Sequence, residues 1–289
     1  MRAVDAKFWL IQAFNGISYG ALLFLVGSGL SLIFGVMRIV NLSHGSYFLL
    51  GGYVALSVIW ATGSWLLAIP IAAFTVALVG LAMERIFLRP LGFDPLRQVL
   101  LTVGFAFLFQ QAALDIWSGN NFDINPPNAL TQSVEVGGIY LPLYRIFMIC
   151  TALGIGLILW LVMEKTRMGA AVRATVDDAQ MARGVGIDTS RVSMFIFALG
   201  AFLAALGGVI GGGFLSVYPG LDFEILPLAF AVVIIGGMGS LGGAAIGALL
   251  VGLADNFGKA LFPEISYFTL YAPMALILAV KPTGLFGRE

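Results

Sequence analysis

The chain has 289 residues, of which 60% are hydrophobic and 10% are charged, and its mean hydropathy is +1.00. Soluble domains carry about 25% charged residues, so this composition excludes an ordinary soluble protein. The formal net charge is zero, and composition therefore gives no reason to expect a nucleic acid or an acidic substrate.

The N-terminal third consists of long apolar stretches. Residues 8–37 carry no formal charge, and between Arg38 and Glu84 the only ionisable basic group is His44. Crossing a bilayer takes about 20 apolar residues, so the first stretch suffices for one crossing and the second for two. Backbone at membrane depth must satisfy its own hydrogen bonds, which predicts helices. The first stretch is about twice the length of a signal-peptide apolar region, so we interpret it as a retained helix.

Charged residues gather in the predicted loops. Glu84–Gln98 contains three arginines and two prolines, and Glu164–Arg191 contains four arginines and a lysine. The segment from Asp115 to Tyr144 has carboxylates and prolines but no lysine or arginine. The positive-inside rule places the first two loops and the C-terminus in the cytoplasm and the third segment outside.

These anchors predict an all-α, polytopic membrane protein with eight or nine spanning elements in a single transmembrane domain, residues 1–289. This arrangement of helices across the membrane predicts that the N-terminus lies outside. Residues 222–255 fit two short helical halves that meet at a glycine break better than one helix. The remaining helices are expected at about 8–36, 45–61, 65–83, 98–117, 145–163, 192–215 and 265–280.

Glycine spacing suggests close helix contacts. Gly239, Gly243 and Gly247 repeat every four residues, which places them on one helix face. Two interpretations stay open: packing within the chain, and a subunit or pathway interface. Irregular backbone at membrane depth is tolerated where it lines a cavity or is buried in protein. The broken elements expected around Asn41–His44 and Gly236–Gly243 are therefore candidates for the pathway, with tight glycine packing as the alternative. The candidate pathway residues are Asn41, Ser43, His44, Gly236, Gly239 and Gly243.

No catalytic, cofactor or metal site emerges from the sequence. His44 is the single histidine, which excludes a multi-histidine metal site. The nearby Ser43 and Ser46 do not lie in a Gly-x-Ser-x-Gly elbow. Lys259 follows a glycine but precedes Ala260, where a phosphate-binding loop requires serine or threonine. The chain is therefore not expected to be an enzyme or to bind ATP by itself.

The loop at residues 164–191 predicts a short amphipathic helix between Met168 and Arg183, in which Arg173 pairs with Asp177. Its apolar face is made of alanine and valine, and lacks the large side chains that would enter lipid. Docking onto a cytoplasmic partner is thus favoured over lying on the bilayer. The residues assigned to this contact are Val172, Val176, Ala179, Ala182, Gly184 and Gly186.

Four segments resemble the LivH-type permease subunits of bacterial branched-chain amino acid ABC importers. They are Gly-Leu-Ser-Leu-Ile-Phe-Gly-Val-Met-Arg-Ile-Val-Asn-Leu-Ser-His-Gly at 29–45, residues 168–188, Gly-Gly-Met-Gly-Ser-Leu-Gly-Gly at 236–243, and Lys-Pro-Thr-Gly-Leu-Phe-Gly at 281–287. The resemblance covers nearly the whole chain and its motifs follow the family's order. It implies a multi-pass permease of the inner (plasma) membrane, of the type II ABC importer kind.

The resemblance also implies partners. These are a second, longer LivM-type permease, two cytoplasmic ATPases that use ATP, and an extracytoplasmic substrate-binding protein. The 164–191 loop would contact an ATPase, although the Glu-Ala-Ala motif of other ABC permeases is matched only loosely. Carboxylates expected on the outer face would help receive the binding protein. They are Asp123, Glu135, Asp222 and Glu224.

Two alternative functions remain at this stage. A same-family importer of urea, amides or aromatic acids is compatible with the sequence, because selectivity in such systems sits largely in the binding protein. A self-sufficient secondary transporter is disfavoured, because the predicted spans hold almost no carboxylates for ion coupling.

Overall fold

The computed structural model describes residues 6–92, 94–281 and 283–287. Over these residues the chain is predominantly helical, and two antiparallel strands form its one sheet. In chain order the elements are α1 (Ala6–Met37), α2 (His44–Thr62), α3 (Trp65–Met83), α4 (Pro95–Trp117), β1 (Ser133–Val136), β2 (Ile139–Pro142), α5 (Leu143–Lys165), α6 (Arg167–Asp177), α7 (Ala179–Gly184), α8 (Thr189–Gly211), α9 (Leu221–Gly236), α10 (Leu241–Leu261) and α11 (Ser266–Val280).

Seven helical segments of the described chain are long and apolar enough to cross a membrane. Two apolar helices are shorter, α9 with 16 residues and α11 with 15. The predicted glycine break is confirmed, since α9 ends at Gly236 and α10 begins at Leu241. The predicted bounds of α1–α5, α8 and α11 differ from the observed ones by at most four residues. The predicted polytopic helical fold is therefore confirmed.

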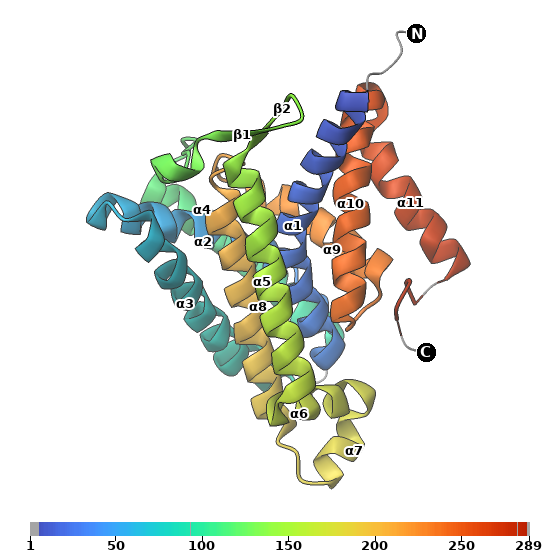
Figure 1. Cartoon of the computed structure of the whole chain (residues 1–289). Coiled ribbons are helices and arrows are strands. Elements are labelled where there is room, and N and C mark those ends of the chain that lie inside the picture. Colours follow the sequence, from blue (N-terminus) through green and yellow to red (C-terminus); the bar gives the residue numbers. More distant parts are fainter. Residues whose placement is uncertain (1–5, 93, 282, 288–289) are drawn as a thin grey trace.

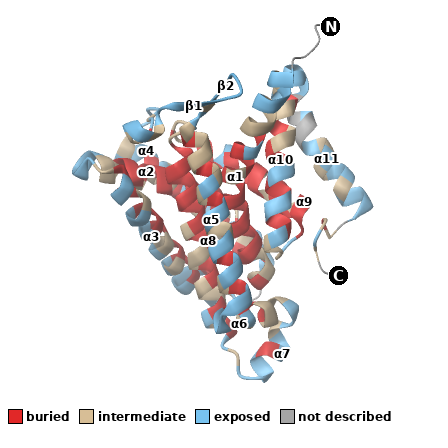
Figure 2. Ribbon diagram, in the orientation of Figure 1, coloured by how far each residue is buried: buried red, intermediate tan, exposed pale blue. Residues whose placement is uncertain are grey.

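Helix α1 forms the centre of the bundle. It is apolar on all sides and mostly buried, as expected for a core helix. Figure 2 shows the buried residues concentrated along α1, α8 and their neighbours. Glycines make the contacts close: a methyl group on Gly20 would lie 2.8 Å from the Ala248 carbonyl oxygen of α10, and one on Gly29 would lie 2.7 Å from the Gly200 carbonyl oxygen of α8. Small residues thus bring neighbouring helix backbones together within the chain.

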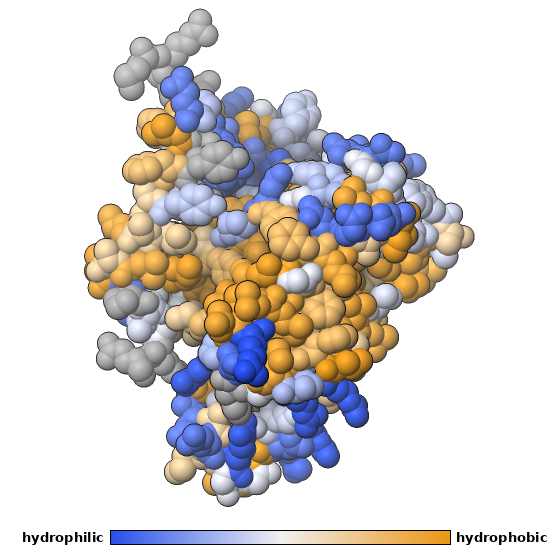
Figure 3. Space-filling view, turned by 180° about the vertical axis from the view of Figure 1, so that it is seen from behind, coloured by the Kyte–Doolittle hydropathy of each residue, from blue (hydrophilic) through white to orange (hydrophobic). Residues whose placement is uncertain are grey.

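The two ends of the bundle differ in charge. Helices α6 and α7 lie at the end opposite the β1–β2 hairpin and the start of α1 (Figure 1). Seen from behind, apolar residues form a band across the middle of the molecule, with hydrophilic residues above and below (Figure 3). The positive-inside rule predicts that the α6–α7 end faces the cytoplasm. We call it the cytoplasmic end and the hairpin end the outer end.

Thiol labelling tests this orientation directly. Asn128 and Gln180 are both exposed, and they lie in the outer-end segment and in α7 respectively. In intact cells that carry a variant with Cys150 replaced by serine, an impermeant maleimide should label Asn128→Cys but not Gln180→Cys. Permeabilised cells should show labelling of both. The reverse pattern in intact cells would contradict the assigned orientation.

Candidate functional site

The chain re-enters the bundle between α1 and α2. Helix α1 ends at Met37, and Arg38 adopts φ 54°, a left-handed conformation that is uncommon for a residue with a side chain. The His44 Nε2–H then donates to the carbonyl of Val26 at 3.0 Å. Because Val26 precedes Met37 by eleven residues, α2 begins about 16 Å back along α1, given a rise of 1.5 Å per residue. The predicted break at Asn41–His44 is therefore a re-entrant segment inside the bundle.

The polar side chains of this segment are completely buried. Asn41, Ser43 and His44 are each 0% exposed. The Asn41 Oδ1 accepts hydrogen bonds from the backbone N–H of Ser43 at 3.1 Å and from its hydroxyl at 2.7 Å. Among the described residues, the Asn41 amide nitrogen and the His44 Nδ1 have no partner. A local turn thus replaces helical hydrogen bonds here, and two polar atoms are left inside the bundle.

Asp222 joins the re-entrant segment to α9. It lies in the first turn of α9 and is 2% exposed. The Ser46 hydroxyl, in the first turn of α2, donates to its Oδ2 at 3.0 Å. Gly45 packs against the Asp222 carbonyl oxygen, where any side chain would collide. Helix N-termini carry positive partial charge, so one carboxyl group sits where two such ends converge.

The placement of Asp222 corrects a prediction. We expected Asp222 on the outer surface beside Glu224, but only Glu224 is exposed. The two residues are two positions apart in α9, and residues at this spacing lie on different sides of a helix. Asp222 therefore faces inwards against α2 while Glu224 faces outwards. Asp123 and Glu135 are exposed at the outer end as predicted, and Asp123 accepts a hydrogen bond from Ser216 at 2.7 Å.

The glycines at the α9–α10 break are packing positions. Gly237 and Gly239 have φ 100° and 77°, which glycine adopts without steric penalty. Gly236 and Gly243 press against each other's backbone, and a methyl group on either would collide with the other's carbonyl. A methyl group on Gly239 would lie 3.1 Å from the Cα of Gly35 in α1. Packing within the chain therefore accounts for the predicted glycine triple, whose third member, Gly247, meets the Val232 carbonyl.

The C-terminal segment completes this break, and sequence reasoning did not assign it a role. The backbone N–H of Leu285 donates to the carbonyl of Ile235 at 2.9 Å, and that of Phe286 to Gly236 at 3.0 Å. The last carbonyls of a helix lack intrahelical partners, so this segment caps α9. The Gly-Leu-Phe-Gly motif is visible in the sequence, but the sequence does not show that it binds the end of α9, which lies about fifty residues earlier.

The cytoplasmic segment contains two helices, and the prediction of one helix was wrong. Asp178 breaks the segment because its Oδ1 accepts from the N–H groups of Gln180 at 2.8 Å and Met181 at 3.0 Å, which starts α7. An aspartate is a favoured N-cap. The ion pair of Arg173 is with Glu164, at 3.7 Å.

The apolar face predicted to dock onto a partner is partly used inside the chain. Val172 and Ala182 are each 3% exposed. Val176 packs against Gly35 and Gly239. The most exposed apolar side chains of this segment are Met181 at 69% and Val185 at 77%, while Met168 is exposed at 37%. The remaining predicted residues are intermediate (Ala179) or exposed (Gly184 and Gly186).

No metal-binding arrangement is found in the part of the chain that the structure describes, where no three His, Cys, Asp or Glu side chains gather. The long apolar helices, the interrupted elements and the buried polar turn define a multi-pass helical membrane protein. The sequence matches the family described as the permease component of the branched-chain amino acid transport system over residues 12–278, and the chain belongs to that family. The resemblance to LivH-type permeases is confirmed, and with it a multi-pass location in the inner (plasma) membrane.

Curated relatives support this assignment over the full length. The high-affinity branched-chain amino acid transport system permease protein LivH of Escherichia coli K12 is 32% identical, with 97% of this chain and 96% of that protein covered. The corresponding permease BraD of Pseudomonas aeruginosa is 28% identical with the same coverage. The ribose import permease RbsC of Haemophilus influenzae is 28% identical over 45% of this chain and 42% of that protein.

Proposed function

We propose that this chain forms, together with a second homologous permease, the pathway of an ABC importer for branched-chain amino acids. The observation that carries the substrate class is the similarity to LivH, which extends over 97% of the chain. Two cytoplasmic ATPases would hydrolyse ATP, and an extracytoplasmic binding protein would deliver the substrate. This chain would be a non-catalytic subunit whose own residues bind no cofactor.

Reconstitution tests this function. Proteoliposomes that contain this chain, the second permease and the ATPases should take up radiolabelled leucine only when ATP and the binding protein are supplied. Omitting the ATPases should abolish uptake. ATP-independent uptake by this chain alone would contradict the proposal and favour a secondary transporter.

The second candidate function is the import of a different substrate. The partial similarity to a ribose import permease supports considering it. The ligand of the binding protein decides between them. Calorimetric titration of that protein with leucine, isoleucine and valine should give binding, whereas ribose, urea, short amides and aromatic acids should not. Binding of one of the latter compounds in place of the former would identify the alternative importer.

The exposed end of α7 is the proposed ATPase contact. Met181 and Val185 are the most exposed large apolar side chains of this segment, and α7 lies at its far tip (Figure 1). Such a contact would exclude water from both side chains. This proposal replaces the buried Val172 side of α6 with the exposed surface of α7.

Charging this surface should uncouple transport. Burying an unpaired carboxylate at an apolar contact costs several kcal/mol, so Met181→Glu combined with Val185→Glu should lower ATP-dependent uptake by about tenfold or more. Met181→Leu, which keeps the apolar contact, should transport normally. Amounts of protein in the membrane should be equal in both variants. Wild-type uptake by the doubly charged variant would exclude this contact.

A further inference from the structure

Helix α6 ends against two distant parts of the chain. The two γ carbons of Val176, in the last turn of α6, face different glycines. A methyl group built on Gly35 of α1 would lie 3.7 Å from one of them. A methyl group built on Gly239, between α9 and α10, would lie 3.7 Å from the other. One branched side chain therefore packs against α1 and the α9–α10 break at the same time.

The backbone of the same residue is held as well. Val176 is the penultimate residue of α6, and the last carbonyls of a helix lack intrahelical partners. The Arg38 guanidinium, directly after α1, donates to the Val176 carbonyl at 3.5 Å. A cation near a helix C-terminus is favourable because that end carries negative partial charge. The end of α6 is thus attached to the end of α1 through both its side chain and its backbone.

The connection between α9 and α10, residues 237–240, is held against α1 at this place. A methyl group on Gly239 would lie 3.1 Å from the Cα of Gly35. The Ser31 hydroxyl donates to the Ser240 carbonyl at 3.5 Å. The connection therefore lies between α1 and α6, in contact with both.

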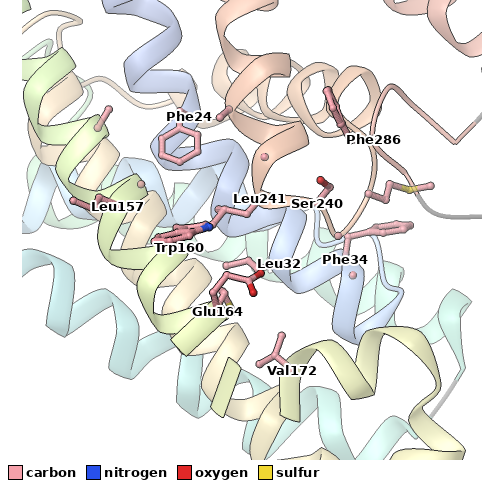
Figure 4. A pocket seen from close by; sticks show the side chains of 18 of the residues that line it. Phe24, Leu32, Phe34, Leu157, Trp160, Glu164, Val172, Ser240, Leu241 and Phe286 are labelled. Carbon is pink, nitrogen blue, oxygen red and sulfur yellow. The ribbon is translucent and has the colours of Figure 1, made fainter. Parts of the chain in front are cut away.

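The C-terminal segment closes another side of this connection. Gly237 packs against the backbone of Phe286 and Gly287. Figure 4 shows that α1, α6, the α9–α10 connection and the C-terminal segment border one hollow, through Phe34, Val172, Ser240 and Phe286 respectively. Four parts of the chain therefore meet near the cytoplasmic end of the bundle.

The ATPase contact proposed above begins almost directly after Val176. Asp178 caps α7, and the exposed Met181 and Val185 side chains follow it. A single residue, Asp177, separates Val176 from this cap. A displacement of α7 therefore reaches the end of α6 without crossing a long flexible segment.

We propose that Val176 is a positioning residue through which ATPase-driven movement of α7 reaches the connection between α9 and α10. The inference rests on the proposed function, since it requires that ATPases act on this chain. Chains of packed side chains and rigid helices carry coupling between distant sites, and a few loop positions absorb hinge movements. The four-residue connection joins two helices and contacts α6, so it meets both conditions. The branched shape of Val176 would couple ATP hydrolysis to transport.

Hydrogen exchange in the purified chain tests the contact itself, because exchange reports local opening. Three amide groups at the connection are hydrogen-bonded, namely those of Gly237, Ser240 and Gly243. Val176→Ala removes both branches and should speed exchange across residues 237–243. Val172→Ala removes the same atoms one turn earlier, where no atom of Val172 lies within 4 Å of a methyl group on Gly239. It should leave this exchange at the wild-type rate. Equal rates in the two variants would overturn the contact.

The amount of leucine taken up per ATP hydrolysed tests the transmission. In the reconstituted importer, Val176→Ala should lower this ratio by about fivefold or more, a factor typical of coupling between sites, while ATP hydrolysis continues. Val172→Ala should keep the wild-type ratio. Val176→Thr keeps both branches of the side chain and should keep the ratio too. A wild-type ratio in Val176→Ala, an equal loss in Val172→Ala or a loss in Val176→Thr would overturn the proposal.

The wild-type importer separates the two proposals. If it shows no ATP-dependent uptake of leucine, the proposed function is overturned, and the role of Val176 with it. If the wild type transports with ATP and Val176→Ala has the same uptake per ATP, only the role of Val176 is overturned. Equal amounts of each variant in the membrane are required for the comparison.

Discussion

Replacing Gly243 with alanine is expected to destabilise the chain strongly. The added methyl group would collide with the carbonyl of Gly236 across the α9–α10 contact. Overpacking of a well-packed core costs about 1–3 kcal/mol, and here both colliding groups belong to backbone, which cannot rotate away. The unfolding midpoint of the purified protein should fall, and uptake by the reconstituted importer should fall with it.

The neighbouring glycine provides the matched control. A methyl group on Gly242 meets no described atom within 4 Å. Gly242→Ala should therefore leave stability unchanged or raise it, since alanine exceeds glycine in helix propensity by up to about 1 kcal/mol. The two variants differ by one position in the same helix. Equal unfolding midpoints for them would show that the α9–α10 contact is looser than the structure indicates.

Replacing Asp222 with alanine is expected to have the second large effect. It would leave the Ser46 hydroxyl without its acceptor and remove the negative group from between the N-termini of α2 and α9. An unsatisfied buried polar group costs about 1–3 kcal/mol, and a charge at a helix end contributes up to about 2 kcal/mol. A loss of about 2–4 kcal/mol in unfolding free energy should follow.

Two further variants separate the causes. Asp222→Asn keeps an acceptor oxygen for Ser46 but removes the charge. Its unfolding free energy should therefore lie between those of the wild type and of Asp222→Ala. Glu224→Ala changes an exposed carboxylate of the same helix turn and should stay within about 0.5 kcal/mol of the wild type. Thermal unfolding followed by tryptophan fluorescence measures all three variants. A Glu224 effect as large as that of Asp222 would contradict the buried role of Asp222.

The sequence by itself determined the class of protein, its long apolar helices and the breaks at Asn41–His44 and Gly236–Gly243. These follow from local properties: uninterrupted apolar length defines a span, charge defines a loop, and glycine or a polar turn residue ends a helix. Residues 236–243 show this well, since the glycine run alone predicted two helices. The family resemblance likewise depended on contiguous motifs, and the comparison with known permeases confirmed it.

Only the tertiary structure decided which side of each helix faces the interior of the bundle and which side faces outwards. Asp222 and Glu224 are equally acidic in the sequence, yet the packing of α9 against α2 buries the first and exposes the second. In the cytoplasmic segment, Asp178 capping splits one predicted helix into two, and Val172 turns inwards while Met181 turns outwards. The partners of these residues lie up to 176 positions away, as Ser46 does from Asp222. Helical periodicity shows which residues share a face, but the direction in which that face points depends on contacts between distant parts of the chain.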